Sequence, residues 1–315
     1  MKEWLGQVVD GDDLERHEKW LCMMWPRLSL LWELLSPRGS LWITLDDNEV
    51  HHARDICDEL FGADAFVAQI VWQKRTSREN RTAIASMHDY ILLLAKASVD
   101  DWKGIRRRLG STGESYSNLD NDPRGDWVSV PFSAQGFRSN QMYKITSPTG
   151  RSLDPPRGRC WAATEPVFKQ LLKDNRIYFP RGGDGRPRVK QFRWEDKGLV
   201  PSSLWLAADV GDNEDAKKEL LTIFTHGNVF DTPKPVELIR RIIEIGSDKN
   251  SICLDSFAGS GTTAQAILAQ NQRDGGERKF ILVETEKYAD SITAERVRRV
   301  IKGIPDAKND VQKKV

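Results

Sequence analysis

The segment 251–284, SICLDSFAGSGTTAQAILAQNQRDGGERKFILVE, constrains the fold of this chain more than any other stretch. It begins with an apolar run that predicts a buried strand over Ser251 to Leu254, followed by a glycine-bearing loop from Asp255 to Gly261. A helix that opens at Thr262 and a second apolar run that ends at Glu284 come next. Strand, helix and strand in this order predict a βαβ unit, and therefore an α/β fold with parallel strands.

The loop of this unit has the features of a site for a nucleoside that carries an acidic group. Gly259 and Gly261 allow the backbone to approach a ligand without a Cβ in the way. The helix start at Thr262 and Thr263 presents free N–H groups and a positive dipole end to a carboxylate or phosphate. Glu284, at the end of the second strand, is placed to accept hydrogen bonds from both hydroxyls of a ribose. An ordinary tight turn is the alternative, and NAD is disfavoured because AGSGTT lacks the third glycine of GxGxxG.

Composition excludes several classes of protein. With 315 residues, 39% of them hydrophobic, the chain has enough apolar material for a substantial core and for two domains. Its four cysteines, Cys22, Cys57, Cys160 and Cys253, lie far apart without a CxxC pair, which argues against a disulfide framework and a zinc knuckle. No apolar run reaches the roughly 20 residues of a membrane span, and the start of the chain is not signal-like. We therefore expect a soluble, cytoplasmic protein with reduced thiols.

Charge is segregated along a chain that is nearly neutral as a whole. Lys and Arg number 47 and Asp and Glu 46, yet residues 138–193 are strongly basic and the first 64 residues are predominantly acidic. This pattern is expected where only one module meets a polyanion such as DNA. Candidate DNA contacts lie in the basic module and in a polar loop after residue 72, which could equally be a solvated loop. They are Lys74, Arg75, Arg78, Arg186, Arg188 and Lys190.

Periodicity divides the chain into three parts. Residues 1–96 predict helices and strands, residues 97–205 a mostly irregular or β-rich module, and residues 206–315 helices around the βαβ unit. The expected helices cover Trp20 to Leu35, a stretch ending near Phe61, Asp215 to Phe224 and Pro235 to Gly246. The expected strands outside the βαβ unit cover Ser40 to Leu45, Phe66 to Trp72 and Tyr90 to Leu94.

A metal site is not expected. Asp46 and Asp47, with His51 and His52, have the residue types of a metal site. An Asp between a strand and a helix, however, is more often an N-cap. We interpret these aspartates as helix-capping residues.

Three sets of motifs carry a resemblance to a known family. DSFAGSGTT (255–263) resembles the cofactor-binding motif D-x-F-x-G-S-G-T-T of the DNA methyltransferases that modify exocyclic amino groups. FDTPKP (230–235) and the helix after it are similar to the family's motif over the methionine end of the cofactor. The segment 20–62, with HDYILLLAK, GRCW and RIYFP, resembles the methylase (Mod) subunits of type III restriction-modification systems. The likeness covers nearly the whole chain, in a permuted order with the cofactor motif last.

This resemblance implies a three-layer, Rossmann-like methyltransferase sheet with an inserted target-recognition domain. It implies methyl transfer from S-adenosylmethionine to adenine N6 in double-stranded DNA, with a second copy of the chain and a restriction subunit as further partners. In the family pattern Phe257 lines the adenosine pocket, Glu284 holds the ribose, and Asp255 orders the loop or meets the cofactor amine. The residues that hold the methionine end are Lys234, Pro235, Gly259, Gly261, Thr262 and Thr263.

One family motif is missing from its expected place. The family holds the target base with D-P-P-Y at the end of a strand, and this sequence has only Asp154-Pro155-Pro156-Arg157, which follows no apolar strand and lacks the stacking aromatic. We interpret it as a loop, assign no catalytic residue, and expect a truncated or split methyltransferase core without its first strand and catalytic tetrapeptide. A non-catalytic DNA-binding or specificity subunit, an N4-cytosine methyltransferase and a nucleotide-dependent oxidoreductase are the alternatives.

Overall fold

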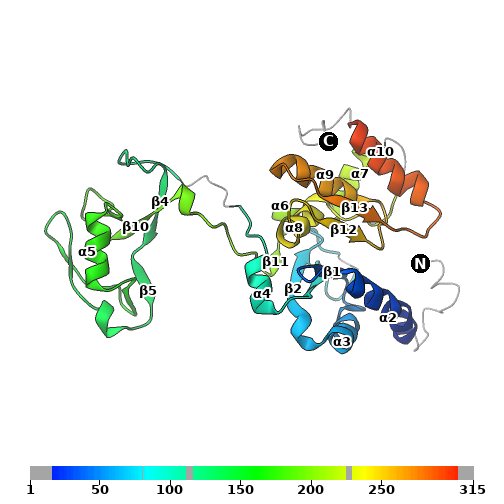
Figure 1. The fold of residues 1–315 in the computed structure, drawn as a ribbon, viewed down its shortest axis with the longest axis horizontal. Coiled ribbons are helices and arrows are strands. Elements are labelled where there is room, and N and C mark those ends of the chain that lie inside the picture. Colours follow the sequence, from blue (N-terminus) through cyan, green and yellow to red (C-terminus); the bar gives the residue numbers. More distant parts are fainter. Residues whose placement is uncertain (1–15, 80, 111–115, 225–228, 304–315) are drawn as a thin grey trace. The chain divides into compact units, whose positions relative to one another are not determined.

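The computed structural model describes residues 16–79, 81–110, 116–224 and 229–303, and it divides the chain into two compact units (Figure 1). The first unit combines the described residues up to Leu109 with those from Val200 on, and the second runs from Gly110 to Leu199. The chain therefore leaves the first unit, builds the second as an insertion, and returns.

The first unit contains a four-stranded sheet in the order β1-β3-β2-β11. β3 pairs antiparallel with both β1 and β2, and β11 joins β2 in parallel. The strands are β1 (Ser40–Leu45), β2 (Phe66–Gln73), β3 (His88–Ala95) and β11 (Leu204–Trp205). The helices of this region are α2 (Arg16–Leu34), α3 (Val50–Phe61), η1 (Ala63–Ala65) and α4 (Val99–Ile105). The three strands predicted before residue 97 are thus confirmed.

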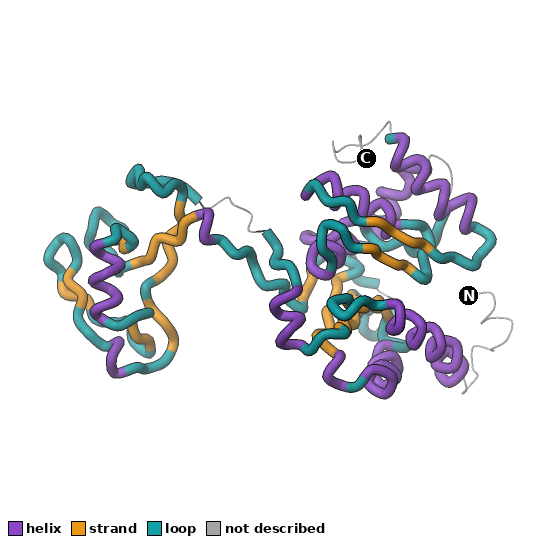
Figure 2. Tube along the Cα trace, in the orientation of Figure 1, coloured by secondary structure: helices purple, strands orange, loops and turns teal. Residues whose placement is uncertain are grey.

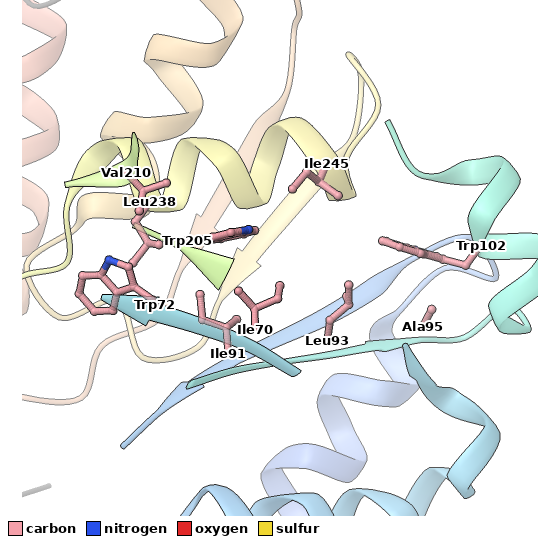
Figure 3. Close-up of a cluster of buried hydrophobic side chains, with 10 residues drawn as sticks. All are labelled: Ile70, Trp72, Ile91, Leu93, Ala95, Trp102, Trp205, Val210, Leu238 and Ile245. Atoms are coloured by element: carbon pink, nitrogen blue, oxygen red, sulfur yellow. The ribbon is translucent and has the colours of Figure 1, made fainter. Parts of the chain in front are cut away.

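The central strand β3 is buried on both faces, because successive side chains of a strand point to opposite sides of a sheet. Ile91 and Leu93 lie in a cluster with Trp72, Trp205 and the helix α8 (Val236–Gly246), as Figure 3 shows. Leu92 and Leu94 pack on the other side with α2 and α3. The run YILLL lacks polar alternation because it joins two apolar layers.

The rest of the first unit contains the predicted βαβ unit. β12 (Ile252–Asp255), α9 (Thr262–Asp274) and β13 (Lys279–Leu282) follow one another, and the two strands pair in parallel. The further helices are α6 (Ala207–Val210), α7 (Asn213–Ile223), the π-helical η4 (Ala289–Ala294) and α10 (Glu295–Lys302). The α/β fold class is therefore confirmed.

Only one face of the β12–β13 pair is covered by described residues. Cys253 and Phe280 pack against α8 and α9. On the opposite face Ile252, Leu254 and Ile281 are 67%, 38% and 52% exposed, so the predicted burial of the first strand is wrong there. Among the described strands, β12 pairs only with β13, and β1 pairs only with β3, which leaves one edge of each open.

The second unit consists of short strands, one α-helix and two short 3₁₀ helices (Figure 2). A three-stranded antiparallel sheet has the order β4 (Trp127–Pro131), β10 (Arg188–Phe192), β9 (Ile177–Tyr178). The other elements are the paired strands β5 (Ser133–Gln135) and β8 (Arg159–Trp161), the paired strands β6 (Ile145–Thr146) and β7 (Ser152–Leu153), α5 (Glu165–Lys173), η2 (Ser139–Gln141) and η3 (Arg193–Glu195). Phe132, Trp161 and Phe168 centre its core. Asp154-Pro155-Pro156-Arg157 lies in the loop between β7 and β8, as predicted.

Two expectations from composition concern the whole chain. All four cysteines are free, as their spacing predicted. Within the described ranges, no helix combines the length and the apolar character that a membrane crossing requires.

Candidate functional site

The glycine-bearing loop between β12 and α9 is folded against other parts of the first unit. Gly259 and Gly261 both adopt positive φ angles, +51° and +77°. A Cβ on Gly259 would lie 3.2 Å from the Phe230 ring, and a Cβ on Gly261 would lie 2.9 Å from the Thr293 carbonyl oxygen. The missing Cβ of Gly261 therefore leaves room for η4, a packing role that the sequence did not indicate, and its predicted ligand contact stays a prediction.

Asp255 orders this loop from the end of β12. Its carboxylate accepts a hydrogen bond from the Thr263 hydroxyl at 2.5 Å and another from the backbone N–H of Phe257 at 3.1 Å. These two contacts connect the strand end to the helix start. Of the two roles considered for Asp255, its contacts are those of loop ordering.

Glu284 fastens the end of the second strand to the same loop. One carboxylate oxygen accepts from the Gly259 N–H at 2.8 Å, and the other accepts from the Thr285 and Glu286 N–H groups at 2.8 and 3.0 Å. Three backbone donors thus converge on one carboxylate, which has about four acceptor positions. The side chain predicted to hold a ribose lies directly beside the glycine loop.

Aromatic side chains surround the loop. Phe230 contacts Gly259, and its ring meets Tyr288 edge to face with centroids 5.4 Å apart. Burial, with the nearby Glu284 carboxylate, raises the pKa of Tyr288, so this phenol stays neutral. Phe257 is 40% exposed and leaves an apolar ring available beside the loop. Tyr288 was not singled out from sequence, although it comes four residues after Glu284.

A buried arginine, Arg296, holds the start of the helix α9 at Thr262 in place. Arg296 is fully buried, and its guanidinium donates to the Thr262 and Ser260 hydroxyls at 2.8 and 3.0 Å and to Gln265 at 2.9 Å. Desolvation lowers the pKa of Arg296 to about 10. The Thr262 hydroxyl therefore points into the protein interior, and the predicted ligand contact of the helix start through its backbone N–H groups stays a prediction.

Lys234 and Pro235 directly precede the helix α8, and Pro235 is its N-cap residue. The Lys234 ammonium lies 3.7 Å from an Asp89 carboxylate oxygen and 5.3 Å from the centre of the Trp72 ring. Burial lowers the pKa of Lys234. Lys74, a predicted DNA contact, donates to the other oxygen of Asp89 at 2.7 Å. Asp89 is therefore the shared carboxylate partner of two lysines that were expected to serve different ligands.

The remaining candidate DNA contacts differ in exposure. Arg75 is exposed and pairs with Glu79 at 3.1 Å, and Arg78 is exposed on the same loop. In the second unit Arg186 is exposed, and Arg188 donates to the Ser129 hydroxyl at 2.7 Å.

Lys190 is a correction to the DNA-contact set. It is 1% exposed, and its ammonium contacts Asp120 and Asp122. The hydrogen bond from Arg124, and to a lesser degree Lys190, holds the pKa of Asp122 well below its usual range. A buried lysine needs such carboxylates to offset its desolvation. Lys190 therefore forms a buried ion pair that stabilises the second unit, and its charge is not available to DNA.

The interpretation of the aspartates after β1 as helix caps is wrong, because α3 begins at Val50 with Glu49 in the N-cap position and no side-chain cap hydrogen bond. Asp46 accepts from the backbone and side chain of Asn48 at 3.1 and 2.9 Å. His52 lies beside His17 and Glu49, and the His17 Nδ1 atom is 3.0 Å from a Glu49 oxygen. This contact joins the start of α2 to the start of α3.

The parallel βαβ unit, with its glycine-bearing loop bound by the Glu284 carboxylate, places this chain in the α/β class of proteins. The chain belongs to the DNA methylase family, whose model matches residues 7–295.

Particular relatives include two restriction-modification proteins. The chain is 34% identical over 302 residues to the type III restriction-modification enzyme StyLTI Mod subunit of Salmonella typhimurium, covering 90% of this chain and 45% of that one. It is 28% identical over 300 residues to the type II methyltransferase M.KpnI of Klebsiella pneumoniae, covering 88% and 69%. The chain thus spans about half the length of the Mod subunit and more of the type II enzyme.

Solved structures of low identity are also similar. TTHA0409 from Thermus thermophilus, complexed with S-adenosyl-L-methionine, aligns with a TM-score of 0.45 and 18% identity over 95% of this chain and 84% of that one. The PvuII DNA methyltransferase, described as cytosine-N4-specific, aligns with a TM-score of 0.46 and 11% identity over 89% and 71%.

Proposed function

We propose that this chain is the cofactor-binding and DNA-binding part of a DNA methyltransferase of a restriction-modification system, with adenine N6 as the methyl acceptor. The observation that carries the proposal is the placement of Glu284 against Gly259 at the start of α9. The family membership and the Mod subunit relative support it. We propose a cytoplasmic location, with a restriction subunit and a second copy of the chain as partners.

The residues around the glycine loop suit S-adenosylmethionine. Glu284 retains acceptor capacity for a ribose hydroxyl beyond its three backbone donors. The positive end of the α9 dipole favours the methionine carboxylate, and the exposed ring of Phe257 offers an apolar surface for adenine. Lys234 and Pro235 would close the methionine end from α8. When bound, the cofactor supplies the activated methyl group.

The chain's part in catalysis is to position that methyl group and the DNA. A target base must be turned out of the duplex and held through its amino group, and no Asp, Asn or Ser followed by Pro-Pro and an aromatic residue occurs in this sequence. We propose that a strand ending in such a motif pairs with β12. The open edges of β1 and β12 and the exposed Ile252 and Leu254 support this, because an added strand would pair the edge and cover apolar surface.

The test has two stages. Calorimetric titration of the purified chain should show binding of S-adenosylmethionine and not of NAD, and preference for NAD would favour the oxidoreductase alternative. Transfer of tritiated methyl groups to DNA is then measured for the chain alone and with a strand ending in Asp-Pro-Pro-Tyr, co-expressed or fused ahead of residue 1. We expect transfer only with the added strand, and mass spectrometry of the nucleosides to show N6-methyladenine.

A second candidate function is a non-catalytic DNA-binding or specificity subunit. The absence of the aromatic-bearing tetrapeptide from the sequence favours it. It predicts DNA retention that weakens steeply with salt, without methyl transfer by the chain alone or with the added strand.

A further inference from the structure

A cavity of about 450 Å³ lies within the second unit, away from the glycine loop in sequence. That volume is within the range of sites for small ligands. Residues from three stretches of the unit line it, around positions 131–133, 151–161 and 180–188. The sequence predicted a basic module here but indicated no cavity.

Guanidinium groups dominate the charge of the cavity. Four arginines line it, Arg151, Arg181, Arg186 and Arg188, and Asp184 is the single acidic residue among the lining side chains. Arginine presents five N–H donors in a planar fork, a geometry that matches phosphate oxygens and the edges of nucleobases. The local excess of positive charge therefore suits an anionic ligand with planar hydrogen-bonding groups.

Three of these arginines are held in place by other residues. Arg188 donates from Nε to the Ser129 hydroxyl at 2.7 Å, and Arg186 donates to the Asp154 carbonyl at 2.6 Å. Arg151 pairs with Asp184 at 3.1 Å. Each contact uses only part of the five donors, so the side chains are preorganised and still have N–H groups for a ligand.

The fourth arginine, Arg181, sits on a strained loop. Its φ angle is +57°, a left-handed conformation that non-glycine residues rarely adopt. Its guanidinium is exposed and has no hydrogen-bond or ion-pair partner among the described residues. Gly185 keeps the loop tight, because a Cβ there would lie 2.5 Å from the Pro180 ring. Backbone strain of this kind concentrates at functional sites, and here it keeps a free cation at the cavity.

The lining of the cavity also includes apolar side chains. Phe132, Leu153 and Trp161 are nearly fully buried behind the wall, and the apolar surface that a ligand can reach comes from proline rings, namely Pro131, Pro156 and Pro180. A site for a bare inorganic anion needs no such surface, whereas the sugar and base of a nucleotide have apolar faces that pack on it.

We propose that this cavity is a nucleotide pocket, in which one nucleotide of the DNA places its phosphate against the arginines and its sugar or base against the apolar wall. The inference rests on the proposed function, since DNA is the substrate class it assumes. It adds Arg151 and Arg181 to the DNA contacts expected from sequence and gives Arg186 and Arg188 a common ligand.

The experiment measures DNA binding by the full chain as a function of salt concentration. The variants are Arg181→Ala, Arg186→Ala and the double variant, and Lys173→Ala is the control, because Lys173 is exposed on α5, outside the cavity lining. Removing a charged hydrogen bond to phosphate should weaken DNA binding by about tenfold per arginine and reduce the slope against salt by about one. The control should match the wild-type chain within about twofold.

Two further measurements separate this inference from the proposed function. S-adenosylmethionine affinity should be unchanged in both arginine variants, since neither residue belongs to the glycine loop. Unchanged DNA affinity in the double variant, while the wild-type chain binds DNA, would overturn the pocket and leave the proposed function standing. A wild-type chain that binds the cofactor but retains no DNA would overturn both the pocket and the assignment of DNA as substrate.

Discussion

Substitution of Glu284 by Gln tests the candidate cofactor site with the smallest change in shape. The wild-type carboxylate accepts from the N–H groups of Gly259, Thr285 and Glu286 at 2.8, 2.8 and 3.0 Å. A Gln amide has one acceptor oxygen and one NH₂ group, and the NH₂ group cannot accept from a backbone N–H. In either orientation of the Gln amide, its NH₂ group lies opposite a backbone N–H group, so two donors face each other. The loop then loses either its link to Gly259 or its link to the chain after β13.

The magnitude follows from the hydrogen bond that is lost. A hydrogen bond to a charged group contributes about 1.5–3 kcal/mol, so replacing the charged acceptor of the ribose hydroxyl by an amide should weaken S-adenosylmethionine binding by roughly ten- to hundredfold. Calorimetric titration measures this, with Glu277→Gln as control, because Glu277 is exposed on the connection before β13 and carries the same charge. An affinity of Glu284→Gln within twofold of the wild-type chain would refute the ribose and loop assignment.

Three further outcomes are expected. Lys190→Met should destabilise the chain by about 1.5–3 kcal/mol in chemical denaturation, because it removes the cation paired with Asp120 and one of the two cations paired with the fully buried Asp122, the other being Arg124; unchanged stability with weakened DNA binding would reinstate Lys190 as a DNA contact. Arg278 lowers the pKa of Asp274 from 3.8 to about 2, so Asp274 contributes stability above pH 4 that is lost as the pH falls towards 2. The difference in unfolding free energy between the wild-type chain and Asp274→Asn should therefore shrink between pH 4 and pH 2. A constant difference would contradict the pairing. Gly261→Ala should cost more than about 1 kcal/mol, since φ is +77° and the new Cβ would lie 2.9 Å from the Thr293 oxygen; thermal unfolding unchanged from the wild-type chain would contradict it.

Local signals predicted most elements of the first unit. The strand and helix of the βαβ unit begin within one residue of the predicted positions, because apolar runs and glycines mark these boundaries directly. Pairing was not predictable in the same way. The strand β11, at Leu204–Trp205, pairs with β2, which lies more than 130 residues earlier in the chain. A strand of two residues is too short to show a periodicity from which it could be predicted.

In the second unit, the weak periodicity of the sequence left one helix unpredicted. The helix α5, Glu165–Lys173, was not expected in the irregular module, although Thr164 precedes it and Phe168 faces its core. The number of basic residues in this module also exceeds the positive charge available to DNA, since Lys190 is buried and Arg176 pairs with Glu195 at 2.7 Å. Sequence identifies which residues are basic, while burial and ion pairing decide which of them can meet a polyanion.

In the glycine loop, the sequence motif alone did not predict which way the side chains point or what packs behind them. The motif predicted that the helix start at Thr262 presents N–H groups to a ligand, but it did not indicate the packing behind the loop. Arg296 from α10 binds the Thr262 hydroxyl in the interior, and Thr293 from η4 occupies the space beside Gly261. The Thr293 hydroxyl also donates to the Gly259 carbonyl at 2.5 Å. The loop that Glu284 binds on one side is therefore held on the other by residues more than 30 positions later. Because the same backbone contacts both, any change that loosens η4 or α10 should weaken the ligand site without touching a ligand-facing residue.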